Sequence, residues 1–229
     1  SNLSYTLDQQ IFIAGSGINP ENTSSDKGNY DYRVIKLSQK GAVLWEKFYG
    51  NSGHDYLKTS LSTREGGLLL AGTRYPVNGF DQSNGKADIW LVRLSEEGNK
   101  LWESSIGTLY DDDVSSIVET DDKGFFIAGN TSHHPELFGA KDIILTQLSK
   151  EGKVINSSII GGEGLDEVVS MEATKDGGVI VLAYTRSNTT SSKDIESFKS
   201  SIQKSHKTTQ TTQNYSSDSS SNYIDSDYK

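Results

Sequence analysis

The side chains of this sequence that are best suited to chemistry are acidic, and one of them recurs at a regular spacing. Asp55, Asp112 and Asp166 each follow a glycine by five residues, and they are separated by 57 and 54 residues. Carboxylates at one place in a fold can bind metal ions or act as general acids and bases. A single aspartate repeated in every unit is, however, typical of an acceptor for turn amides. We therefore predict a structural role for these three repeat markers.

The other chemically suggestive residues lack the pattern that a catalytic or metal site requires. Residues 111–113 are all aspartate, but they lack the alternating ligands and central glycine of a calcium loop. His133 and His134 are adjacent and have no Cys or Glu at metal-ligand spacing. The sequence contains no nucleophile elbow, phosphate loop or zincin motif. We predict no catalytic residues, no metal and no cofactor, and a glycosidase-type carboxylate pair stays an alternative.

The elements that must position these residues form a repeat of about 55 residues over residues 1–185. A first apolar run is found at 11–15, 68–72, 125–129 and 179–183. A second run follows at 31–37, 88–94 and 142–148. Because both runs and the Gly–Asp marker keep one spacing, the sequence contains three units and an incomplete fourth.

The turns and the apolar runs predict the fold of each unit. Ser-x-x-Gly follows every second run, as at residues 95–98, and suits a hairpin turn whose glycine adopts a positive φ. Another glycine-containing turn precedes each later first run, which gives two hairpins and four strands per unit. Leu69, Phe126 and Ile180 occupy equivalent places in runs that do not alternate, so we predict that all three are buried.

An antiparallel sheet covered on both faces by like neighbours is typical of a propeller blade. We therefore predict an all-β, propeller-type array of four-stranded antiparallel blades, with about three and a half repeats; a sandwich or a β-solenoid is the alternative. Trp45, Trp90 and Trp102 stand inside the strand runs, which favours packing between blades over sugar stacking.

Long polar segments join the first and second runs, and they are expected to emerge on one face of the array. Loops on one face of a propeller carry its binding residues. The candidate ligand-contact residues in these segments are Tyr75, Phe80, His133 and His134.

Composition restricts the partners and the location. The net charge of −9 disfavours nucleic acid and anionic lipid, which bind through clustered Lys and Arg. No apolar run is long enough to insert in a membrane, and there is no Cys. Residues 186–229 form a degenerate last repeat and a Ser/Thr-rich tail, which we expect to be disordered from about residue 203.

A family resemblance adds to this interpretation. Residues 88–102, followed by Gly107, Asp112 and residues 122–129, resemble one unit of the bacterial seven-bladed β-propeller repeat family. They resemble more closely the tandem copies in secreted and surface proteins of Bacteroidota. The resemblance covers about residues 5–185 and implies a propeller and an extracytoplasmic location, but no activity.

The sequence departs from that pattern at several places. Asn156 stands at the position of Trp45 and Trp102, and Gln9 and Gln10 replace a Gly-Gly pair. In the fourth unit, Glu196 and Ser197 replace the apolar centre of the second run. We therefore expect an open arc that belongs to a longer array of repeats. The expected function is a non-catalytic secreted or surface module that binds protein or glycan; an acid-dependent hydrolase and a structural spacer are the alternatives.

Overall fold

The computed structural model describes residues 2–6, 8–20, 30–50, 53–75, 86–132, 141–161 and 164–186. All regular elements within these residues are β-strands. They form three four-stranded antiparallel sheets and a final two-stranded hairpin, which confirms the predicted all-β array of four-stranded blades. The tail that the sequence predicts to be disordered lies outside the described residues.

The strands of each blade follow one another in sequence order. The first blade contains β1 (Asn2–Tyr5), β2 (Ile11–Ile18), β3 (Tyr30–Leu37) and β4 (Val43–Tyr49). The second contains β5 (His54–Ser62), β6 (Leu68–Tyr75), β7 (Asp88–Leu94) and β8 (Lys100–Ile106). The third contains β9 (Asp112–Glu119), β10 (Phe125–Ser132), β11 (Lys141–Leu148) and β12 (Val154–Ile160). The last hairpin is β13 (Asp166–Ala173) and β14 (Val179–Thr185).

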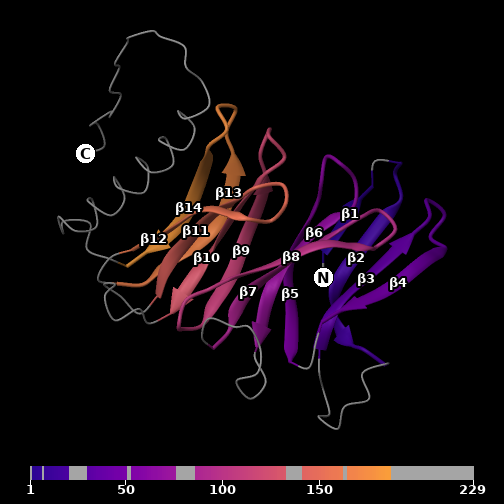
Figure 1. Ribbon diagram of the computed structural model, residues 1–229, viewed down its shortest axis with the longest axis horizontal. Coiled ribbons are helices and arrows are strands. Elements are labelled where there is room, and N and C mark those ends of the chain that lie inside the picture. The colour runs from indigo at the N-terminus through magenta and orange to yellow at the C-terminus, as the bar shows by residue number, and fades with distance from the viewer. Residues whose placement is uncertain are drawn as a thin grey trace.

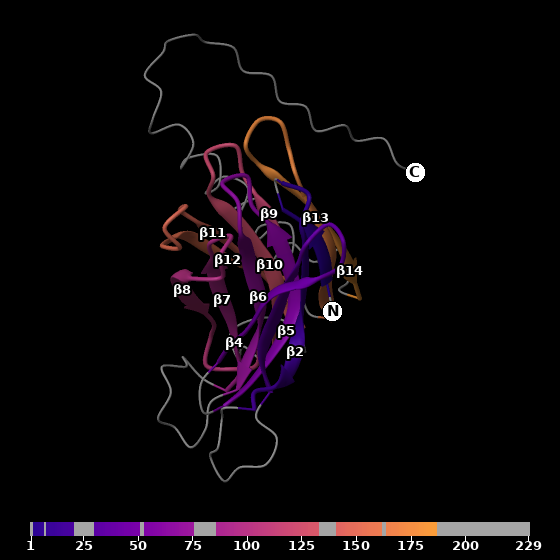
Figure 2. The same cartoon turned by 90° about the vertical axis from the view of Figure 1, so that its right-hand side faces the viewer.

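The blades stand beside one another in chain order, from the indigo first blade to the orange last hairpin in Figure 1. Figure 2, seen from the side of the first blade, shows the sheets standing one behind another. The first strand of each later blade contacts the blade before it: β5 contacts β1, β2 and β3, and β9 contacts β5, β6 and β7. The repeat therefore produces one interface per pair of neighbouring blades.

Tight turns close the hairpin between the third and fourth strands of each blade. Gly41, Gly98 and Gly152 have φ values of 82°, 71° and 78°, which an L-residue adopts only with strain. The Gly98 amide donates to the Ser95 carbonyl at 3.0 Å, and the other two turns form the same bond. These turns are those that the Ser-x-x-Gly spacing predicts.

The core consists of apolar layers between successive blades. Leu68 and Leu69 are consecutive in β6, yet they enter different layers because side chains alternate between the two faces of a strand. Leu68 packs between the first two blades, with Phe12 and Trp90. Leu69 packs between the second and third blades, with Phe125. A strand buried on both faces needs apolar residues at every position, so the run does not alternate.

The prediction of burial was wrong for Ile180. Phe126 and Leu69 are buried, as predicted, but Ile180 is 66 % exposed and Leu182 is 58 % exposed. Both lie in β14, on the face of the last hairpin that points away from the third blade. No strand of the described chain follows that face, so the repeat position alone does not bury the residue.

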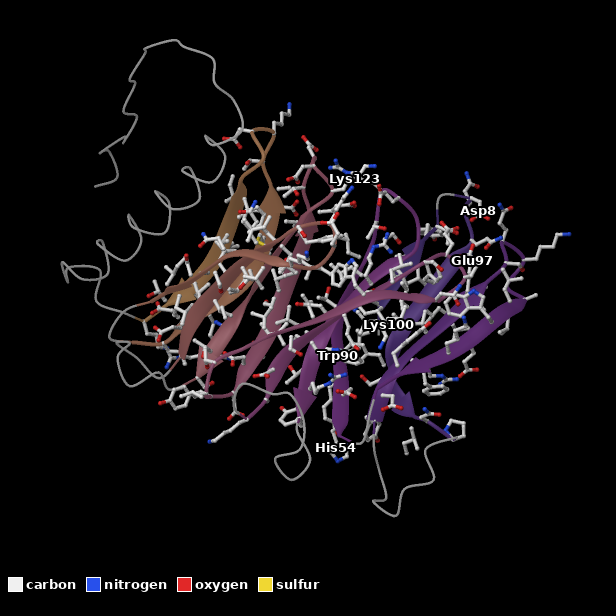
Figure 3. All side chains as sticks on the ribbon, in the orientation of Figure 1. Asp8, His54, Trp90, Glu97, Lys100 and Lys123 are labelled. Carbon is white, nitrogen blue, oxygen red and sulfur yellow. The ribbon has the colours of Figure 1, made fainter. Side chains whose placement is uncertain are left out.

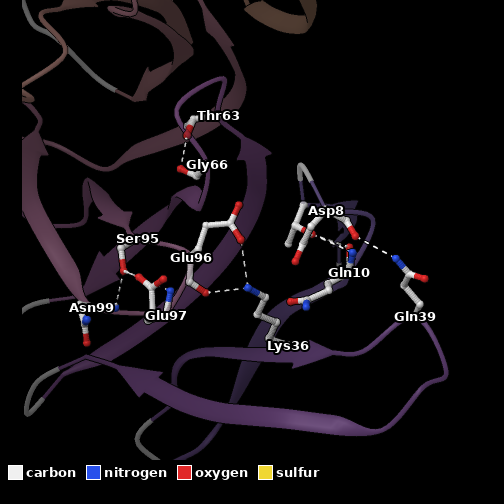
Figure 4. A network of polar contacts seen from close by, with 11 residues as sticks. Asp8, Gln10, Lys36, Gln39, Thr63, Gly66, Ser95, Glu96, Glu97 and Asn99 are labelled. Atoms are coloured by element: carbon white, nitrogen blue, oxygen red, sulfur yellow. Dashed lines mark hydrogen bonds and ion pairs between the residues drawn. The ribbon is translucent and has the colours of Figure 1, made fainter.

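Polar contacts also join neighbouring blades. The Lys36 Nζ of β3 donates to both the carbonyl oxygen and a carboxylate oxygen of Glu96, at 3.1 Å each (Figure 4). Glu96 belongs to the turn between β7 and β8, so the bond runs from the first blade to the second. The Lys36 ammonium also lies 5.3 Å from the Phe12 ring centroid, a cation–π contact.

Candidate functional site

Four aromatic side chains gather at the junction of the first and second blades. Tyr30 begins β3, His54 and Tyr56 lie at the start of β5, and Tyr75 ends β6. We call these four residues the tyrosine patch. His54 and Tyr75 are register partners in neighbouring strands, which brings the beginning of β5 beside the end of β6. Figure 3 shows His54 at the lower edge of the sheets, opposite the turns that carry Asp8 and Lys123.

The rings of the tyrosine patch contact one another and remain open to solvent. Tyr56 is the centre: its ring centroid lies 5.4 Å from that of Tyr30 and 5.9 Å from those of His54 and Tyr75. The Tyr56–Tyr75 pair is edge-to-face, a favourable arrangement for aromatic rings. Tyr30, Tyr56 and Tyr75 are 36 %, 41 % and 45 % exposed. The patch is therefore a fixed aromatic surface rather than a core.

The same four repeat positions carry different side chains at the other two blade junctions. At the second junction they are Ala87, Asp111, Asp113 and Ser132, and at the third they are Lys141, Leu165, Glu167 and Arg186. Lys141 forms ion pairs there with Asp113, at 3.1 Å, and with Glu167, at 3.0 Å. Because two of the three junctions are built without these rings, the scaffold does not require the tyrosine patch.

The electrostatic surroundings of the patch are acidic. Partial burial raises the pKa of Tyr75, and the carboxylates of Asp111 and Asp113 raise it further by disfavouring a phenolate. These two residues occupy the start of the third blade, next to the end of β6. A ligand on the tyrosine patch would therefore meet aromatic faces and a carboxylate edge.

The candidate ligand-contact residues from the sequence have different outcomes. Tyr75 lies in the tyrosine patch, whereas Phe80, His133 and His134 lie outside the described residues. Sequence reasoning missed Tyr30, His54 and Tyr56. The available signal was the aligned repeat itself, in which the positions at one blade junction are aromatic and the same positions at the other two junctions are not.

The repeat markers Asp55, Asp112 and Asp166 are buried, each at a blade junction. A second buried aspartate from the preceding blade accompanies each: Asp31, Asp88 and Asp142 respectively. Gly50 shows how close the carboxylates come, because a Cβ placed there would lie 2.1 Å from Asp31 Oδ1 and 2.8 Å from Asp55 Oδ2. Gly107 likewise leaves space for the carboxylates of Asp88 and Asp112, and Gly161 leaves space for that of Asp142.

These carboxylates accept hydrogen bonds from groups that lie within 19 residues of them in the sequence. Asp112 accepts bonds from the Thr108 amide, at 2.6 Å, and from the Thr108 hydroxyl, at 3.1 Å. Asp55 accepts a bond from Arg74 Nε at 3.1 Å, and Asp31 accepts one from Asn19 at 3.0 Å. Burial raises the pKa of Asp31 and of Asp112. At the first two junctions these local partners tie the buried carboxylates to the chain around them and so stabilise the loops between blades.

Within the described ranges, no group of three or more His, Cys, Asp or Glu side chains is arranged to hold a metal ion.

A polar cleft of about 340 Å³ lies beside the buried Asp31–Asp55 pair. Its charged groups already have partners: the Arg74 guanidinium stacks 3.6 Å from the Trp90 ring centroid, and Glu103 accepts bonds from Trp90 Nε1 and Lys100. The remaining lining residues are Phe48, Tyr49 and Gly50. The contacts of Arg74 with Trp90 and Asp55 hold its side chain in a fixed position, directly before Tyr75 in β6.

The predicted packing residues Trp45 and Trp102 lie on the fourth strands, β4 and β8, of the first and second blades. The Trp45 ring is 5.8 Å from that of Phe12, and the Trp102 ring is 6.0 Å from that of Phe125. The Trp102 indole donates to the Lys150 carbonyl of the third blade at 2.9 Å. A Cβ at Gly98 or Gly152 would meet one of the two indoles, so each tryptophan reaches a turn of the following blade.

No protein-family model matches the chain, and no curated protein matches it. Among solved structures, it is similar to a protein of unknown function from Bacteroides caccae, with 12 % identity and a TM-score of 0.46. The match covers 78 % of this chain and 50 % of the other, so this chain spans about half the length of that protein. The described segments include no helix with the length and hydropathy of a membrane span.

Proposed function

We propose that this protein is a non-catalytic binding module, a secreted or cell-surface β-propeller repeat domain that contacts a protein partner through the tyrosine patch. The observation that carries the proposal is the presence of four clustered aromatic residues at one blade junction and at neither of the other two. The resemblance of the repeat to secreted and surface propeller repeats supports the location and the family.

The shape of the surface favours a protein partner. A small-molecule site is usually a deep, mostly apolar cavity, whereas the tyrosine patch is an open surface with rings about two-fifths exposed. Tyrosine is enriched in protein–protein interfaces, where it supplies a large contact area and a hydroxyl group.

The charge of the surface favours basic side chains on that partner. The chain carries a net charge of −9, and Asp111 and Asp113 lie at the edge of the patch. Lys and Arg side chains are attracted to the faces of aromatic rings as well as to carboxylates. We therefore propose that the partner presents a basic segment to the tyrosine patch.

A displayed library of random peptides tests this function with the full chain as the target. We expect the selected peptides to be rich in Lys, Arg and aromatic residues, and to bind less tightly as the salt concentration rises. Tyr56→Ala and Tyr75→Ala should weaken their binding by about tenfold or more, as for interface hot spots. The matched control is Leu101→Ala, which changes an exposed side chain at the opposite end of the second blade.

Two results would contradict the proposal. Equal binding by the Tyr56→Ala, Tyr75→Ala and Leu101→Ala variants would show that the tyrosine patch is not the site. Binding to members of a glycan array that both tyrosine variants lose, without selection of basic peptides, would replace the protein partner with a glycan.

A further inference from the structure

The interfaces between blades use the same repeat positions each time. The face of a blade that points to the following blade carries Phe12 in β2, Leu69 in β6 and Phe126 in β10, and we call it the forward face. The opposite face, which we call the backward face, carries Leu68 in β6 and Phe125 in β10. At every junction of the described chain, a forward face packs against a backward face.

The last hairpin presents an uncovered forward face. Ile180 and Leu182 stand at the repeat positions of Phe126 and Ala128, which are buried in the third blade. In β14 these two side chains are mostly exposed, and Tyr184 beside them is 48 % exposed. The hairpin therefore retains apolar residues on a face that packs in each preceding blade.

The first blade presents an uncovered backward face. Leu3 and Tyr5 of β1 are 61 % and 62 % exposed. Their register partners Ile13 and Ile11 lie on the same face, at the repeat positions of Leu70 and Leu68 in the second blade. Those two leucines are fully buried against the first blade. The described blades thus present two exposed apolar faces of opposite type.

We propose that copies of this chain associate head to tail, with the forward face of the last hairpin of one copy packed on the backward face of the first blade of the next. Contiguous exposed apolar faces mark interaction surfaces. The occupant follows from continuity with the interfaces inside the chain, where the same pairs of positions pack three times. Such a contact is heterologous, so it produces a closed ring or an open filament.

The mass of the full chain in solution, measured by light scattering over about a hundredfold range of concentration, gives the first test, because association follows mass action. We expect the mass to rise above that of one chain. Leu3→Glu and Ile180→Glu each place a charge on one end face, at a side chain whose exposure lets the fold tolerate it. Each variant alone should associate at least about tenfold less tightly, whereas Val154→Glu, on the outer strand of the third blade, should behave as the wild type.

A mixture of the two variants gives the sharper test. The Leu3→Glu copy keeps an intact forward face and the Ile180→Glu copy keeps an intact backward face, so an equimolar mixture should form a one-to-one dimer and nothing larger. A wild-type chain that is monomeric at all concentrations would overturn the proposal. Failure of the mixed variants to pair, or association lost in only one of the two variants, would also overturn it.

Discussion

The hydroxyl of Tyr32 in the first blade donates a hydrogen bond to the backbone carbonyl of Trp90 in the second blade, at 2.9 Å. Both side chains are buried, and their ring centroids lie 4.7 Å apart. Burial raises the pKa of Tyr32 well above its ordinary value, so the hydroxyl keeps its proton. Tyr32 is two residues from Tyr30, so this bond fixes the junction that carries the tyrosine patch.

Replacing Tyr32 with Phe should lower the free energy of unfolding by about 1–2 kcal/mol, because it removes a buried hydrogen bond and keeps the ring. Urea unfolding followed by tryptophan fluorescence measures the change. Tyr49→Phe is a matched control, since the Tyr49 hydroxyl bonds the Gly98 carbonyl at the same junction in a partly buried position. We expect a smaller loss there; equal stability of wild type and Tyr32→Phe would contradict the role given to the Tyr32 hydroxyl.

A substitution at Gly107 tests how tightly the chain packs around the buried carboxylates of Asp88 and Asp112. A Cβ at this position would lie 2.1 Å from Asp88 Oδ1 and 3.1 Å from Asp112 Oδ2, so Gly107→Ala must displace a buried carboxylate. We expect a loss of about 2–4 kcal/mol, the scale of severe packing and polar-burial changes. Gly41→Ala is the control, because Gly41 has φ +82° and no atoms within 4 Å of the added carbon. It should lose only about 1 kcal/mol from backbone strain; equal losses would contradict the packing argument.

The exposure of Ile180 leads to a third prediction, about the stability cost of truncating equivalent side chains. Leu69→Ala and Phe126→Ala remove buried side chains between blades and should each cost about 2–5 kcal/mol. Ile180→Ala, at the equivalent position, should cost less than about 1 kcal/mol in a dilute monomeric sample, because its side chain is mostly exposed. Three equal losses in denaturant melts would show that Ile180 is buried in solution.

The repeat determined most of what could be predicted about the fold. Apolar residues at every position of residues 68–70 indicated a strand covered on both faces, because Leu68 and Leu69 enter different layers. The Ser-x-x-Gly spacing predicted the turns, because glycine adopts a positive φ without a steric penalty. These are local signals that recur, so each copy supported the others.

The features that escaped prediction depend on what lies next to a repeat position. Ile180 has the sequence context of Phe126, but burial requires a following blade, which repetition within the strand does not reveal. Tyr30 and Tyr56 are 26 residues apart in the chain. They meet only because β5 of one blade packs against β3 of the blade before it. The tyrosine patch therefore became visible only when the blades were in place.

The buried carboxylate Asp112 predicts an unusual dependence of stability on pH. Burial raises its pKa above the ordinary 3.8, and the nearby Asp88 carboxylate raises it further. The folded chain therefore binds more protons than the unfolded chain between 3.8 and the raised pKa. This contribution to stability is fully present below 3.8 and is lost as the pH rises through the raised pKa. Asp112→Asn cannot titrate, so its stability lacks this contribution.

Urea unfolding of the wild type and of Asp112→Asn at about pH 7, 5 and 4 measures the effect as a difference between two curves. We expect the wild type to gain stability relative to the variant as the pH falls through this interval. The exposed Asp121 gives the control variant Asp121→Asn, whose difference from the wild type should not follow that course. If the curves of wild type and Asp112→Asn run parallel from neutral pH to pH 4, burial does not perturb Asp112, and its carboxylate is as well solvated in the folded chain as in the unfolded one.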